Sequence, residues 1–115
     1  MKSPFETVLG GLIRQRGVLG SLVVGEDDGI IIDANLQVGV DGKMIAALAA
    51  ALYRRARLSA QAAGLGAVAF LQLEAVGGHL CVAGRDGLVL VALTEPRAHI
   101  GLIRSAMLQS ASALA

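Results

Sequence analysis

The 115-residue sequence has few of the side chains that usually form binding or catalytic sites. It contains one cysteine, no tryptophan, one tyrosine and two phenylalanines. The single cysteine, Cys81, cannot form an intrachain disulfide, which agrees with a reducing compartment. The scarcity of aromatic rings removes the stacking surfaces with which proteins hold unpaired bases.

Charged residues are also scarce. They make up 17% of the chain and leave a net charge of +1, so no long-range field attracts nucleic acid or an anionic membrane. The longest apolar run, Met44 to Leu52, is much shorter than the roughly 20 residues of a transmembrane helix. The first residues lack the apolar core of a signal peptide. We therefore expect no nucleic-acid partner, no membrane insertion and a cytoplasmic protein.

Aliphatic residues, by contrast, are abundant. Hydrophobic residues make up 55% of the chain, which is more than a monomer of this size normally needs for its core. A chain of this length is expected to form one domain, residues 1–115. The apolar excess therefore indicates self-association.

The first third of the sequence predicts a helix followed by a β-hairpin. Ser3, Pro4 and Glu6 have the order of an N-cap, first turn and third position, so a helix should begin there. Two segments rich in β-branched residues, 18–24 and 30–36, are separated by an acidic turn ending in glycine and should pair as antiparallel strands.

The remainder predicts a long helix, a three-stranded meander and a closing helix. Asp41 is placed to cap a helix over residues 43–63, which ends at Gly64. The other expected elements are strands over 67–75, 79–83 and 88–93 and a helix with its apolar face at Ile100, Ile103, Met107 and Ala111. The order α-β-β-α-β-β-β-α, with five antiparallel strands and segregated helices, indicates an α+β sandwich.

No motif in the sequence predicts catalysis, a metal site or a cofactor. The acidic run 26–28 lacks the alternating ligands of a calcium loop and is interpreted as a hairpin turn. His79 and His99 lack metal-ligand spacing. Cys81 lies in a strand between apolar residues and is interpreted as a buried hydrophobe. The glycines around Leu65 lack the Lys-Ser/Thr ending of a phosphate-binding loop. We therefore assign no catalytic residue, no metal and no cofactor.

The long helix is the element most indicative of function. One side should pack on the core; its residues are Met44, Ile45, Leu48, Leu52, Leu58 and Ser59. A second side contains small residues, which let another helix approach closely. We expect this side to form a dimer interface through Ala46, Ala50, Tyr53 and Arg57. The alternative is that the alanines only favour helix formation.

Several short sequence segments, which occur in order along nearly the whole chain, resemble those of the Roadblock (dynein light chain) family. Residues 17–24 and 28–32 resemble its opening hairpin, and residues 44–53 resemble its alanine-rich central helix. Residues 86–91 and 100–104 resemble its last strand and the start of its last helix. The resemblance implies a profilin-like Roadblock sandwich, a five-stranded sheet with helices on both faces.

The resemblance also implies a mode of assembly and a partner. It implies homodimers in which the central helices pack together and the third strands pair into one continuous sheet. Bacterial members of this kind often serve small Ras-like GTPases, as activators or scaffolds, and eukaryotic relatives attach to dynein or to GTPase scaffolds. The bare domain resembles the prokaryotic kind. Arg54, Arg55 and Arg57 are then candidates for partner contact, the alternative being that they form a solvated helix face.

Four functions are compatible with the sequence to different degrees. The first is a non-enzymatic binding module for a small GTPase, and the second is a homodimeric adaptor in another assembly. The third is a small-ligand sensor, which requires a pocket with convergent polar groups. Catalysis ranks last, because the chain lacks a phosphate loop and a catalytic constellation.

Overall fold

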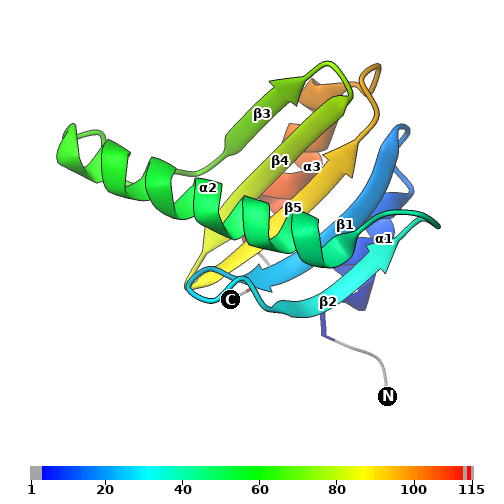
Figure 1. Ribbon diagram of the computed structural model, residues 1–115, viewed down its shortest axis with the longest axis horizontal. Helices are drawn as coiled ribbons and strands as arrows, with labels where there is room; N and C mark the ends of the chain where they lie inside the picture. The colour runs from blue at the N-terminus through cyan, green and yellow to red at the C-terminus, as the bar shows by residue number, and fades with distance from the viewer. Residues whose placement is uncertain (1–3, 113, 115) are drawn as a thin grey trace.

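The β-branched segments of the chain form one five-stranded antiparallel sheet, with helices on both faces (Figure 1). The computed structural model describes residues 4–112 and Leu114. Its elements are α1 (Glu6–Ile13), β1 (Val18–Gly25), β2 (Ile31–Leu36), α2 (Gly42–Ala62), β3 (Leu71–Ala75), β4 (Gly78–Arg85), β5 (Leu88–Thr94) and α3 (Ile100–Ser112). The predicted class, element order and placement of helices on both faces are confirmed.

The strands lie in the order β2-β1-β5-β4-β3, so β1, β5 and β4 occupy the middle of the sheet and β2 and β3 its edges. The three middle strands are buried on both faces. Helices α1 and α3 cover one face, and α2 crosses the other (Figure 1). The C-terminal turns of α2 extend beyond the sheet on the side of β3.

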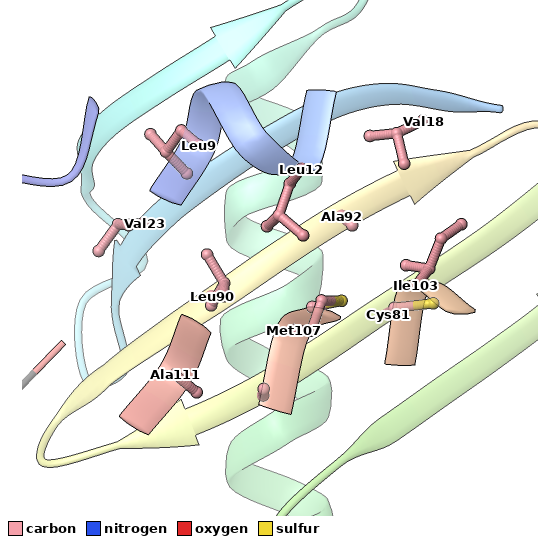
Figure 2. Close-up of a cluster of buried hydrophobic side chains, with 11 residues drawn as sticks. Leu9, Leu12, Val18, Val23, Cys81, Leu90, Ala92, Ile103, Met107 and Ala111 are labelled. Carbon is pink, nitrogen blue, oxygen red and sulfur yellow. The ribbon is translucent and has the colours of Figure 1, made fainter. Parts of the chain in front are cut away.

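The face under α1 and α3 carries the larger apolar cluster. Figure 2 shows Leu9 and Leu12 of α1, and Ile103 and Met107 of α3, above side chains of β1, β4 and β5. The Ser21 hydroxyl group, buried in β1, donates a hydrogen bond of 2.9 Å to the carbonyl oxygen of Leu9. Apolar burial and this bond together fix α1 on the sheet.

The opposite face packs against small residues of α2. Its side chains are Leu22, Val24, Leu80, Val82, Val89 and Val91, and the helix contributes Ala46, Ala49, Ala50 and Tyr53. Because the strands supply the bulk, alanines on the helix let it lie close to the sheet without leaving a void.

The boundaries of three elements test the local predictions. The Asp41 carboxylate accepts a 3.1 Å bond from the Met44 amide, so the predicted cap of α2 is confirmed. At the N-terminus, Ser3 lies outside the described residues, and Phe5 occupies the cap position of α1. The third strand begins at Leu71 rather than at residue 67; the carbonyl group of Val68, in the preceding segment, accepts a hydrogen bond from a tyrosine of α2 instead.

Candidate interaction surface on the central helix

The small-residue side of α2 faces the sheet, and of the side predicted to face the core only Ile45 and Leu52 pack partly against it. Ala46 and Ala50 are 0% and 1% exposed in the single chain, because they pack against its own sheet. Tyr53 is buried in the same cluster. The prediction that these three residues form a dimer interface is therefore wrong. Met44 and Leu48, predicted to be core residues, are 65% and 42% exposed.

The side of α2 that points away from the sheet carries three large exposed apolar side chains, together with Arg55. We define its outer face by the exposed residues Met44, Leu48 and Leu58. Within the described residues no other element covers these side chains. Exposed apolar side chains that recur along one side of a helix are a common feature of interaction sites.

This outer face continues toward the edge strand β3. A shallow groove of about 210 Å³ separates α2 from the strand and is lined almost entirely by apolar side chains, among them Leu48, Leu73 and Leu80. β3 pairs with β4 only, so its other edge has no partner in the described part of the chain. An unpaired strand edge next to exposed leucines offers both backbone hydrogen bonds and apolar area to a second chain.

Two of the three candidate arginines are engaged within the chain. The Arg54 guanidinium donates to the carbonyl oxygens of Glu26 and Asp27, at 2.6 and 2.9 Å. Arg57, one turn later on the same side, holds the Glu26 carboxylate at 3.1 Å. Both therefore fasten the β1–β2 turn to α2. Arg55 is exposed on the side of the outer face, so it is the arginine of the three that is free to reach a partner.

Tyr53 occupies the junction between this turn and the segment that precedes β3. Its hydroxyl group donates a 2.8 Å hydrogen bond to the carbonyl oxygen of Val68. Burial raises the pKa of the phenol, the nearby Glu26 carboxylate raises it further, and Arg57 opposes both. Sequence reasoning missed the roles of Glu26 and Val68, because no local pattern connects residues so far apart in the chain.

Comparisons with known proteins show which proteins this chain is related to. No protein-family model matches the chain. Two uncharacterized proteins of Methanocaldococcus jannaschii are 32% identical to it: MJ0310 over 92% of both chains, and MJ0714 over 96% of this chain and 93% of the other. This chain belongs to their family. None of the helices in residues 4–112 is long and apolar enough to cross a membrane.

Solved structures show which fold this chain has. A Roadblock/LC7 domain from Streptomyces avermitilis matches with a TM-score of 0.86, at 20% identity over 97% of this chain and 95% of that one. The gliding protein MglB of Thermus thermophilus matches with 0.84, at 17% identity over 99% and 90%. An MglB in a tetrameric arrangement matches with 0.85, at 18% identity over 99% and 89%. The chain has the Roadblock/LC7 fold, as the sequence segments that resemble this family indicated.

Proposed function

We propose that the protein is a non-enzymatic regulator or scaffold that acts as a homodimer and binds a small Ras-like GTPase. The observation that supports this most strongly is the apolar outer face of α2, Met44, Leu48 and Leu58, which lies uncovered beside an unpaired strand edge. The apolar excess of the composition is consistent with a second burial partner for this face.

In the proposed dimer, the outer faces of two α2 helices pack together and two β3 strands pair across the symmetry axis. Such an interface is self-complementary, as a two-fold dimer requires. Edge pairing supplies main-chain hydrogen bonds, while Leu48 and Leu73 supply apolar contacts next to it. The tetrameric arrangement found for an MglB is consistent with self-association in proteins of this fold.

The GTPase is proposed as partner on the resemblance to activators of gliding motility and on the fold shared with the gliding protein MglB. Arg55 is the arginine that we assign to this contact, since it is exposed whereas Arg54 and Arg57 are engaged with the β1–β2 turn. Charge reversal in Arg55→Glu should weaken binding without disturbing the fold. Reversal at Arg54 or Arg57 is a poorer test, because it also releases the β1–β2 turn.

Binding to a candidate GTPase in its GTP-analogue and GDP forms tests the proposal. A regulator should bind the two forms with different affinities, since only differential affinity couples binding to nucleotide state. The protein alone should hydrolyse no GTP, and turnover that persists through repurification contradicts the non-enzymatic assignment. Equal affinity for both forms indicates a passive scaffold. If no GTPase encoded near its gene binds, the dimeric adaptor becomes the preferred function.

A further inference from the structure

An open cavity of about 670 Å³ lies at one end of the sheet, in the size range of small-molecule sites. Four segments meet there: the β1–β2 turn, α2, residues 67–69 and the β4–β5 turn. The cavity exists because β3 begins only at Leu71, opposite Val82, so residues 83–85 of β4 pair with β5 alone. Tyr53 lies at this gap and bridges it through its bond to Val68.

Two arginines from different elements line this cavity, and neither uses its full set of donors. Arg57 contacts the Glu26 carboxylate through one terminal nitrogen, and its buried Nε has no acceptor within the described residues. The Arg85 Nε lies 3.7 Å from the Asp86 carboxylate, beyond hydrogen-bond distance. A guanidinium group carries five N–H donors in a geometry that suits carboxylates and phosphates.

The two carboxylates at the cavity do not balance these arginines equally. Glu26 has a side chain only 13% exposed and is already paired with Arg57. Asp86 has a side chain 76% exposed at the rim, where water screens its charge. A bound anion therefore displaces only Asp86, the loosely held neighbour of Arg85, while Arg57 keeps its pair with Glu26 and offers the anion its remaining donors.

We propose that this cavity binds the carboxylate or phosphate group of a small molecule between Arg57 and Arg85, above the Tyr53 ring. The site lies between the helix and the sheet margin and does not depend on a GTPase partner. This cavity supports the small-ligand sensor hypothesis, because it is a pocket with convergent polar groups. The pocket lies at the end of the sheet and not within the core.

The first test is an NMR titration of the whole chain with malonate and with inorganic phosphate, using sodium chloride at matched ionic strength as the reference. One of the two oxyanions should cause saturable shifts at the amides of residues 67–69 and 84–87, and its identity decides between carboxylate and phosphate. Arg85→Gln should weaken this binding about tenfold or more, since it removes a charged hydrogen-bond donor. Arg14→Gln, at the end of α1 on the opposite face of the sheet, should bind as the wild type does.

A variant expected to bind more tightly and the absorbance of Tyr53 together separate a loss of binding from a folding defect. Asp86→Asn should bind the anion more tightly, because the competing carboxylate is gone, and asparagine tolerates the positive φ of 51° at this position. Tyr53 is the only tyrosine of a chain without tryptophan, so its absorbance titration reports on the cavity directly. A bound anion should raise the phenol pKa further. Absence of saturable shifts with both probes, or equal binding by the wild type and Arg85→Gln, overturns the proposal.

Discussion

The ring of Tyr53 lies directly against the backbone of Gly84. A Cβ atom added to Gly84 would overlap the ring and the hydroxyl group of Tyr53. Because the same hydroxyl group is bonded to Val68, one side chain of α2 connects β4 to the segment that leads into β3. Glycine at position 84 is thus required by a close approach between a helix and a strand.

Replacing this glycine should therefore destabilise the protein. Gly84→Ala forces the Tyr53 ring to move and breaks its bond to Val68, with an expected loss of about 1–3 kcal/mol in the free energy of unfolding. Urea denaturation of the variant and the wild type measures this difference in the free energy of unfolding. The matched control is Gly11→Ala in α1, where nothing lies within 4 Å of the added atom and alanine should stabilise the helix by about 0.5–1 kcal/mol. Equal stability of Gly84→Ala and the wild type would contradict the close contact.

Glutamate substitutions on the buried and on the exposed side of α2 should have opposite outcomes. Ala50→Glu puts a charge into the core under the helix, and should destabilise the fold by about 3–5 kcal/mol. Leu48→Glu puts the same charge on the outer face and should leave the fold intact while the proposed dimer dissociates. Circular dichroism during urea denaturation and sedimentation measure the two effects. A monomeric wild type, or a Leu48→Glu protein that remains dimeric, would argue against the proposed interface.

The order and type of every element could be predicted, because each carries a local signal. Alternation and β-branched residues mark the strands, glycine turns separate them, and Asp41 with Gly64 brackets the long helix. Gly64 adopts a positive φ of 73° at the end of α2, as its position after the last helical residue indicated. The start of β3 differs from the prediction, since the bond from Tyr53 to Val68 joins residues that no local pattern connects.

The orientation of α2 could not be predicted in this way, because both sides of the helix are apolar. The bulk of Met44 and Leu48 predicts that they face the core. The sheet, however, already contributes Leu22, Val89 and Val91 to the space beneath the helix. Packing density therefore favours alanine at the contact and leaves the larger side chains outside. The candidate anion site has the same limitation, since its residues come from four separate segments and converge only in the folded chain.

The raised pKa of Tyr53 predicts how stability depends on alkaline pH. The folded state favours the neutral phenol, because burial and Glu26 disfavour the phenolate. This contribution to stability is fully present below the ordinary value of 10.0 and is lost as the pH rises through the higher folded-state pKa. Tyr53→Phe should remove that pH dependence between these limits. Parallel dependence of stability on pH for the two proteins, from about pH 9 upward, would show that Tyr53 has no such role.

Cys81 should be inert toward thiol reagents in the folded protein. Its side chain is fully buried under α1 and α3, and burial raises the thiol pKa from 9.0 to about 11. Since the thiolate is the nucleophile, both the lack of access and the high pKa suppress the reaction at about pH 8. Modification should therefore proceed only through unfolding, at a rate that rises with urea in proportion to the unfolded fraction. Gly84→Ala, which lowers stability from the opposite face of the sheet, should accelerate the labelling, while Gly11→Ala should not. Labelling of the wild type that is faster than its unfolded fraction multiplied by the rate for the urea-unfolded chain would show that the cluster around Cys81 opens without global unfolding.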